Sequence, residues 1–221
     1  MKKGEKARIL VVDDHAVVRE GLSRLINREA DMVVCGEAQD GPSALKSINS
    51  SKPDLAIVDI SLSSSSGLDV TKAIKASQPE IIVLVLSMHE ELLFAERALR
   101  AGASGYIMKL EAPKTLIEAI RRVLGGKIYL SEKMTDYFLN QVAHFPAAGK
   151  DSPIHNLTDR EFEVFMLIGK GVGTRQIADQ IHLSVKTIEA YKENLKKKLN
   201  LKTAAELVQY AIEWSHHHHD R

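Results

Sequence analysis

The chain has 221 residues, of which 44% are hydrophobic and 27% are charged, with 30 Lys and Arg against 29 Asp and Glu. This length and composition indicate one large or two modest globular domains, and they exclude global disorder, a fibrous repeat and a miniprotein held by disulfides. The nearly balanced charge gives no electrostatic case for a protein that coats nucleic acid with its whole surface.

The N-terminus and the cysteine content favour a cytoplasmic protein without a membrane segment. Charged residues and one short apolar run precede Asp13, so we expect neither a signal peptide nor a membrane span here. Cys35 is the single cysteine and cannot form an internal disulfide, which fits a reducing compartment. The run His216–His219 could be a tag or a native tail, and it receives no metal.

Short apolar segments alternate with amphipathic ones over about the first 125 residues. We predict strands at 8–13, 32–37, 54–59, 81–87 and 105–109, and helices near 15–29, 41–51, 67–77, 90–101 and 113–125. Such repeated strand–helix units predict an α/β fold with a doubly wound, five-stranded parallel sheet of the flavodoxin-like kind. Its ligand crevice should lie at the C-terminal ends of the strands.

The pattern changes after Gly125 and Gly126. We expect one more helix at 131–142 and then a loop-rich connection at 144–154 that contains two prolines. Only helices are expected beyond Leu157, with capping boxes at Thr158–Glu161 and Thr203–Glu206 and caps at Ser184 and Thr174. The predicted organisation is a domain at 1–126, a linker with one helix at 127–156, a small all-α domain at 157–214 and a tail at 215–221.

Five polar side chains fall at predicted strand ends and should meet at one edge of the sheet: Asp13, Asp14, Asp59, Ser87 and Lys109. Three carboxylates in one place would repel one another unless a cation intervened, and an all-oxygen set suits Mg²⁺. A nucleophilic Asp59, Mg²⁺ on Asp13 and Asp14, and Ser87 and Lys109 on phosphoryl oxygens would meet the needs of phosphoryl transfer. Each residue alone could be an ordinary helix cap or surface side chain.

Residues 8–125 resemble a response-regulator receiver domain of two-component signalling, through Val-Val-Asp13-Asp14-His, Ile-Val-Asp59-Ile, Leu-Ser87 and Tyr106-Ile-Met-Lys109. The resemblance implies that Asp59 accepts a phosphoryl group from a sensor histidine kinase. It further implies that Asp14 binds Mg²⁺ directly with Asp13 nearby, that the backbone carbonyl of Ser61 completes the metal site, and that Ser87 and Tyr106 form the switch. In isolation, Tyr106 could equally be a half-buried aromatic at a sheet edge.

Two positions depart from the receiver pattern. Leu110 follows Lys109 where many receivers have a cis-proline, so the placement of Lys109 depends on a loop that reaches Pro113. Ser63 stands where proline is usual, within a run of four serines, which predicts a more flexible loop and puts the lifetime of the phosphoryl group in question.

The C-terminal helices have helix-turn-helix spacing, with a tight turn at His182–Ser184. On the helix after the turn, Ile188, Leu195 and Leu199 share the face expected to enter the core. Six lysines between 184 and 202 (186, 192, 196, 197, 198 and 202) against two glutamates give a local charge of 6 − 2 = +4. Basic charge is therefore concentrated where DNA contact would need it, although a solvated amphipathic helix also carries exposed lysines.

Residues 157–214 resemble the LuxR-type DNA-binding domain, through Leu157-Thr-x-Arg160-Glu161, Ile177-Ala178, Leu183-Ser184, Thr187-Ile188 and Lys198-Leu199. The chain as a whole thus resembles a NarL/FixJ-type response regulator, with departures at Gly173, Gln176 and Tyr191. Alignment with the family suggests base contacts from Glu189, Ala190 and Glu193. Phosphate contacts are expected from Thr187, Tyr191, Lys192, Lys196 and Lys197, and Thr174 and Lys186 are further candidates for contact with DNA.

The predicted function is a transcription factor, not an enzyme, that is switched by phosphorylation and then forms a homodimer on DNA with inverted half-sites. An alternative is a DNA-binding dimer in which the receiver only dimerises, independently of phosphorylation. A Mg²⁺-dependent phosphatase of the haloacid-dehalogenase kind is disfavoured because Ser61 stands where its second aspartate is needed. A nucleotide-binding Rossmann enzyme is disfavoured because no glycine-rich turn follows the first strand.

Overall fold

The computed structural model of the chain describes residues 5–63, 65–144 and 153–219. They belong to two compact units, Met1–Phe138 and Leu139–Arg221. Most of the predicted connection at 144–154 lies outside the described residues, as do the last two residues of the predicted tail. The two units are described separately below.

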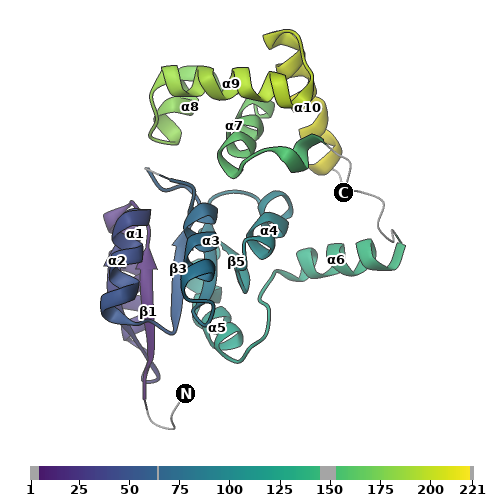
Figure 1. Cartoon of the computed structure of the whole chain (residues 1–221). Helices are drawn as coiled ribbons and strands as arrows, with labels where there is room; N and C mark the ends of the chain where they lie inside the picture. The colour runs from purple at the N-terminus through teal and green to yellow at the C-terminus, as the bar shows by residue number, and fades with distance from the viewer. Residues whose placement is uncertain (1–4, 64, 145–152, 220–221) are drawn as a thin grey trace. The chain divides into compact units, whose positions relative to one another are not determined.

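The first unit contains the predicted five-stranded parallel sheet, with helices packed around it (Figure 1). Its strands have the order β2-β1-β3-β4-β5. Its strands are β1 (Ala7–Val12), β2 (Met32–Ala38), β3 (Leu55–Asp59), β4 (Ile82–Ser87) and β5 (Gly105–Met108). The central strands β1, β3 and β4 are almost entirely buried because helices cover both faces of the sheet. Each observed strand lies within one or two residues of its predicted bounds.

Two apolar layers hold helices against the sheet. The helices α1 (Ala16–Asn27) and α5 (Ala112–Leu124) pack on one face through Ile26 and Leu116. On the other face, α2 (Gly41–Ser51) and α3 (Gly67–Ser77) pack through Ile48 and Ile74. The helix α4 (Glu91–Arg100) lies beside β5 and α3. This arrangement leaves the C-terminal strand ends as the edge where loops can carry a site.

The helix α6 (Glu132–His144) follows α5 and corresponds to the helix predicted at 131–142. Between α5 and α6, Tyr129 forms a parallel bridge with Gly105 at the outer edge of β5. The start of the predicted linker is therefore part of the first unit. A sequence pattern could not show this, because the bridge involves a single residue with no strand periodicity.

The second unit is all-helical, as predicted. It contains a 3-10 turn η1 (Pro153–Asn156) and the helices α7 (Asp159–Gly169), α8 (Thr174–Gln180), α9 (Val185–Leu199) and α10 (Ala204–His219). Trp214 of α10 makes edge contacts with the rings of Phe162 and Phe165, at centroid distances of 5.7 and 5.8 Å. These contacts join the first and last helices of the unit. The last helix continues to His219, into the segment predicted as a tail.

The helix caps agree only in part with the sequence. Thr158 and Glu161 form the predicted capping box, and Ser184 caps α9. The assignment of Thr174 as a cap is wrong, because Gly173 is the cap and Thr174 is the first residue of α8. The Gly173 N–H donates to Gln176 Oε1 at 3.3 Å, so the Gln side chain supplies one half of the usual box.

The box expected at Thr203 is also half formed. Thr203 Oγ1 accepts the Glu206 N–H at 3.1 Å, whereas the Glu206 carboxylate accepts the N–H of Lys202 at 2.8 Å.

In the part of the chain that the structure describes, none of the helices has both the length and the apolar character to cross a bilayer.

Candidate functional site

The predicted acidic crevice forms at the C-terminal edge of the sheet. Asp59 is the last residue of β3, Asp13 follows β1, and Lys109 follows β5. The Nζ of Lys109 lies 2.7 Å from Asp59 Oδ2 and 2.7 Å from Asp13 Oδ2. Both carboxylates are buried, at 1% exposure for Asp13 and 2% for Asp59. The structure thus brings together three predicted residues from strands that are distant in sequence.

Burial decides the protonation of the central carboxylate. It raises the pKa of Asp59 to about 6, an effect that Lys109 opposes and the nearby Asp13 reinforces. The same pair of carboxylates raises the pKa of Lys109, against the effect of its own burial. The Lys109 ammonium is therefore a positive charge beside the Asp59 carboxylate, and a second cation would further stabilise the ionised form of Asp59.

The donor atoms near Asp59 suit a divalent metal ion. Asp13, Asp14, His15 and Asp59 each offer one ligand atom, and these atoms lie within 4.8 Å of one another. Three of the four are carboxylate oxygens, which are the ligands that Mg²⁺ prefers. The donor set therefore fits the predicted ion.

Ser61 lies beside the Asp59 carboxylate, since its backbone N–H hydrogen-bonds to Asp59.

The sequence interpretation did not include His15 in the site, although His15 follows Asp14 directly. Its Nδ1 lies 2.7 Å from Asp14 Oδ1 and 3.3 Å from Asp13 Oδ1. The backbone N–H of His15 also donates to Asp13 Oδ1 at 2.9 Å. His15 therefore orients both neighbouring carboxylates.

Gly67 allows the helix after the serine-rich loop to begin against the site. Its N–H donates to the carbonyl of Ile60 at 2.7 Å. A Cβ at this position would lie 1.8 Å from the backbone oxygen of Asp59, so only glycine permits the approach. Ser66 caps the same helix through the N–H of Leu68.

The predicted switch residues are linked through a second histidine that the sequence interpretation missed. Ser87 Oγ accepts the His89 N–H at 3.0 Å, and the Tyr106 hydroxyl donates to the His89 carbonyl at 2.8 Å. The His89 ring reaches Ser61 Oγ at 2.9 Å and stacks on Phe94 at a centroid distance of 4.4 Å. Only the folded chain shows that His89 joins the two loops beside Asp59.

Tyr106 is fully buried, at 1% exposure, although it lies on the edge strand β5. The interpretation of this residue as a half-buried edge aromatic is therefore wrong. Its burial raises the pKa of the phenol, while a hydrogen bond with Ser87 acts in the opposite direction. The hydroxyl remains protonated and acts as a donor to the loop that contains His89.

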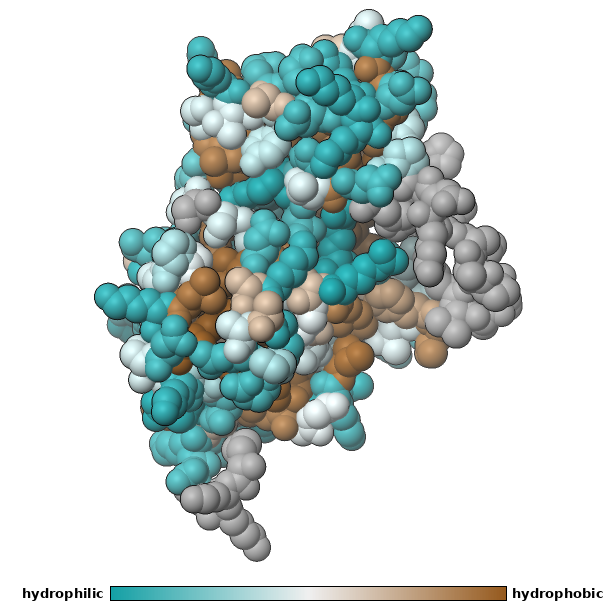
Figure 2. Space-filling model, in the orientation of Figure 1, coloured by the Kyte–Doolittle hydropathy of each residue, from teal (hydrophilic) through white to brown (hydrophobic). Residues whose placement is uncertain are grey.

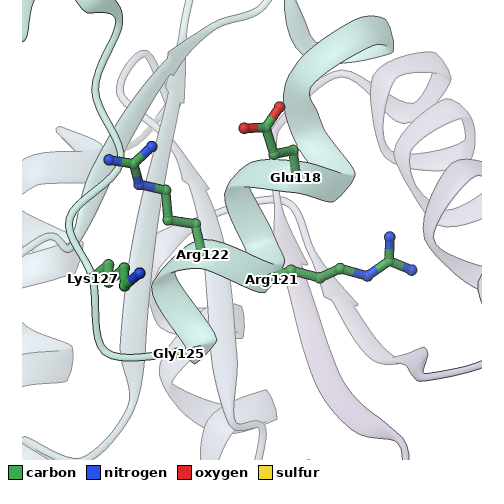
Figure 3. Close-up of a pocket in the computed structure, with 5 residues that line it drawn as sticks. All are labelled: Glu118, Arg121, Arg122, Gly125 and Lys127. Atoms are coloured by element: carbon green, nitrogen blue, oxygen red, sulfur yellow. The ribbon is translucent and has the colours of Figure 1, made fainter.

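A surface cavity of about 520 Å³ lies away from this edge, at the C-terminal end of α5 (Figure 3). Glu118, Arg121, Arg122, Gly125 and Lys127 line it. Arg121 is held by Glu29 at 2.6 Å and by Asp31 at 3.0 Å. Basic residues at a helix C-terminus commonly stabilise the helix dipole, and this cavity has no connection with the acidic crevice.

In the second unit, α8 and α9 form the predicted helix-turn-helix. The turn contains His182 with a φ of 54°, and Ile188, Leu195 and Leu199 of α9 are buried as expected. Hydrophilic side chains cover most of this unit on the face seen in Figure 2. The candidate base-contacting residues Glu189, Ala190 and Glu193 are exposed.

Several lysines of α9 have partners within the unit. Lys192 Nζ lies 3.1 Å from Glu189 Oε1 and 3.1 Å from Thr174 Oγ1, and Lys196 Nζ lies 2.8 Å from Glu193 Oε1. These contacts place Thr174 at the α8–α9 interface. Part of the lysine charge counted along the sequence is therefore balanced by the neighbouring glutamates of α9.

One more lysine of the basic segment and one further candidate residue have structural partners. Lys198 Nζ contacts the buried Glu161 carboxylate at 2.6 Å and so ties α9 to α7. Thr187 engages the cap of α9, because its Oγ1 lies 2.7 Å from Ser184 Oγ. Among the remaining candidates, Lys186 and Lys197 are exposed and Tyr191 is half-buried.

Known proteins show the same two-part organisation. Residues 9–121 match the response regulator receiver domain, and residues 155–211 match the luxR family of bacterial regulatory proteins. The chain is 39% identical over 209 residues to the oxygen regulatory protein NreC of Staphylococcus carnosus, covering 93% of this chain and 96% of that protein.

Solved structures agree with these matches. A LuxR-family two-component response regulator from Aurantimonas sp. is 34% identical, with a TM-score of 0.59 over 63% of this chain and all of that one. The RcsB response regulator of Salmonella typhimurium has the same fold over 95% of this chain and 98% of that one, with a TM-score of 0.62 at 22% identity. The chain belongs to the NarL/FixJ-type response regulators, which join a receiver to a LuxR-type helix-turn-helix domain.

Proposed function

We propose that this response regulator is switched by transfer of a phosphoryl group from a sensor histidine kinase to Asp59. The observation that carries the proposal is the placement of Asp59, buried at the end of β3 with the Lys109 ammonium 2.7 Å from its Oδ2. A carboxylate oxygen attacks the phosphorus in line, and the donor imidazole leaves. Lys109 then stabilises the negative charge on the phosphoryl oxygens.

Asp13, Asp14, Asp59 and the backbone carbonyl of Ser61 are the groups that would hold Mg²⁺. When bound, the ion gathers phosphoryl oxygens and offsets their charge. We assign Asp14 to direct coordination and Asp13 to contact through a water, so Asp14→Ala should weaken Mg²⁺ binding more than Asp13→Ala. A calorimetric Mg²⁺ titration of both variants tests this order, and the opposite ranking would overturn it.

The phosphoacceptor assignment is tested with acetyl phosphate and Mg²⁺ as the phosphoryl source. The wild type should gain acid-labile phosphate and Asp59→Asn should gain none, because an amide cannot form an acyl phosphate. Asp69→Asn is the control, because Asp69 is an exposed residue of α3 paired with Lys72. Equal labelling of all three proteins would refute the assignment of Asp59.

We also propose that the protein acts in the cytoplasm and that the phosphorylated chain forms a homodimer. The second unit of each protomer would then bind one of two inverted half-sites in DNA. The helix α9 would enter the major groove, with Glu189, Ala190 and Glu193 at base edges. Contacts to the phosphate backbone are assigned to Lys186, Thr187, Tyr191, Lys192, Lys196 and Lys197, with Thr174 supporting Lys192.

Binding selection on random DNA, with and without acetyl phosphate, tests this part of the proposal. Inverted repeats enriched only from the phosphorylated sample would support it. Equal enrichment by untreated wild type and by Asp59→Asn would instead favour the phosphorylation-independent dimer.

A further inference from the structure

The segment between α5 and α6 is bound to the edge of the receiver sheet. The Tyr129 N–H donates to the Ser104 carbonyl at 3.0 Å, and the Tyr106 N–H donates to the Tyr129 carbonyl at 3.0 Å. A Cβ on Gly105 would lie 2.7 Å from the Tyr129 oxygen, so glycine permits this close approach. The segment therefore occupies backbone groups that an edge strand would otherwise present to another chain.

The first turn of α6 is held by a buried carboxylate from another helix. Glu91, at the start of α4, is 9% exposed, and its Oε1 accepts the Ser131 N–H at 2.9 Å. Ser131 Oγ in turn accepts the Met134 N–H at 3.1 Å. Met134 is fully buried. Burial raises the pKa of Glu91, and the contact with Ser131 partly offsets this effect.

Only Glu90 separates Glu91 from His89, the residue that links the candidate switch residues Ser87 and Tyr106. The preceding residue, His89, is bound to Ser87 Oγ by its N–H and to the Tyr106 hydroxyl by its carbonyl. If the Ser87 hydroxyl turns toward a phosphoryl oxygen on Asp59, its contact with the His89 N–H changes. The loop at 88–90 leads directly into the first turn of α4, so a change there reaches Glu91 over a very short distance.

We propose that Glu91 couples the phosphorylation site to the linker helix α6. Movement of the loop at 88–90 withdraws the Glu91 carboxylate from the Ser131 N–H and loosens the first turn of α6, which leads toward the DNA-binding unit. This inference rests on the proposed function of Asp59. An ordinary structural cap would instead hold α6 equally in the unphosphorylated and the phosphorylated chain.

Amide hydrogen exchange on the full-length chain measures this coupling. In the unphosphorylated wild type, the amides of Ser131 and Met134 should be protected by their acceptors, and acetyl phosphate with Mg²⁺ should speed their exchange about tenfold. One hydrogen bond to a buried carboxylate is sufficient for an effect of about that size. Glu91→Ala should show the fast exchange already without phosphoryl donor and should respond little to it.

Two further variants make the result specific. Glu91→Gln retains an uncharged acceptor oxygen and should give exchange between the wild type and Glu91→Ala, which keeps the test valid if the alanine variant folds poorly. Glu96→Ala is the matched control, because Glu96 lies on the same helix and pairs with Arg100 at 2.5 Å on the surface. Its exchange at Ser131 and Met134 should equal that of the wild type in both states.

Intact-mass measurement of the same samples separates the two levels of the proposal. A chain that carries the phosphoryl group while exchange at Ser131 and Met134 stays unchanged would overturn the role of Glu91 and leave the phosphoacceptor assignment standing. A wild type that acquires no phosphoryl group would overturn both. Equal exchange in Glu91→Ala and the unphosphorylated wild type would also overturn the role of Glu91.

Discussion

The buried carboxylate of Asp59 should lower the stability of the metal-free receiver at neutral pH. Its pKa is about 6 in the folded chain, against 3.8 for an exposed aspartate. This difference corresponds to a cost of about 3 kcal/mol at pH values above 6. Because the folded pKa is raised, the cost is absent below pH 3.8 and develops as the pH rises through about 6.

The variant Asp59→Asn removes this cost while nearly preserving shape. Lys109 keeps a carboxylate partner, since its Nζ also lies 2.7 Å from Asp13 Oδ2. We expect the free energy of unfolding of the receiver to rise by up to about 3 kcal/mol at pH 7.5, and the gain to shrink toward zero near pH 4. Asp69→Asn, an exposed carboxylate paired with Lys72, should change stability by less than about 0.5 kcal/mol.

Urea unfolding in EDTA, followed by far-ultraviolet circular dichroism at pH 7.5 and pH 4.5, provides the measurement. Trp214 is the only tryptophan of the chain, so its fluorescence reports the unfolding of the second unit separately. Added Mg²⁺ should stabilise the wild type more than Asp59→Asn, because it binds the folded state through this carboxylate. A variant no more stable than the wild type at pH 7.5, or a gain that does not depend on pH, would refute the reasoning.

Three further predictions concern packing, the second unit and DNA recognition. Gly67→Ala should destabilise the receiver by about 3 kcal/mol because its Cβ would overlap the Asp59 carbonyl. Gly21→Ala, with open space around it in α1, should stabilise the receiver by about 0.5–1 kcal/mol. Thermal unfolding compares the two variants, and equal melting temperatures would contradict the prediction. Burial of Glu161 opposes its ionisation, but hydrogen bonds from Lys198 and Thr158 lower its pKa, so the stability that these bonds supply should be present above pH 4.5 and lost at lower pH. Lys198→Met should lower the free energy of unfolding of the second unit by about 2 kcal/mol at pH 7. Urea unfolding followed by Trp214 fluorescence measures this, and an unchanged midpoint would contradict it. Lys196→Ala should reduce the salt slope of DNA binding by about one, whereas Glu189→Ala should relax preference at one base pair with little change in slope; uniform loss of affinity in both would show that α9 docks differently.

Sequence periodicity is sufficient to predict the receiver fold, because each strand and helix repeats its apolar pattern over many residues. Consecutive apolar residues in Ile9–Val12 indicate a central strand buried on both faces, and β1 is indeed central, since it pairs with β2 on one side and β3 on the other. The positions of Asp13 and Asp59 follow from the same pattern, since parallel strands end at one edge. Helix ends were less certain because they depend on single caps, as the choice of Gly173 over Thr174 shows.

The amino-acid pattern alone predicts the two-domain class, the parallel sheet and the set of acidic, hydroxyl and basic residues at its edge. The folded chain is needed to show which groups are partnered: His89 with Ser87 and Tyr106, Glu91 with Ser131, and Lys198 with Glu161. These contacts join residues through single hydrogen bonds across separate elements, and such bonds leave no periodic trace in the sequence. The raised pKa of Asp59 has the same origin, because burial by neighbouring strands exists only once the sheet has formed.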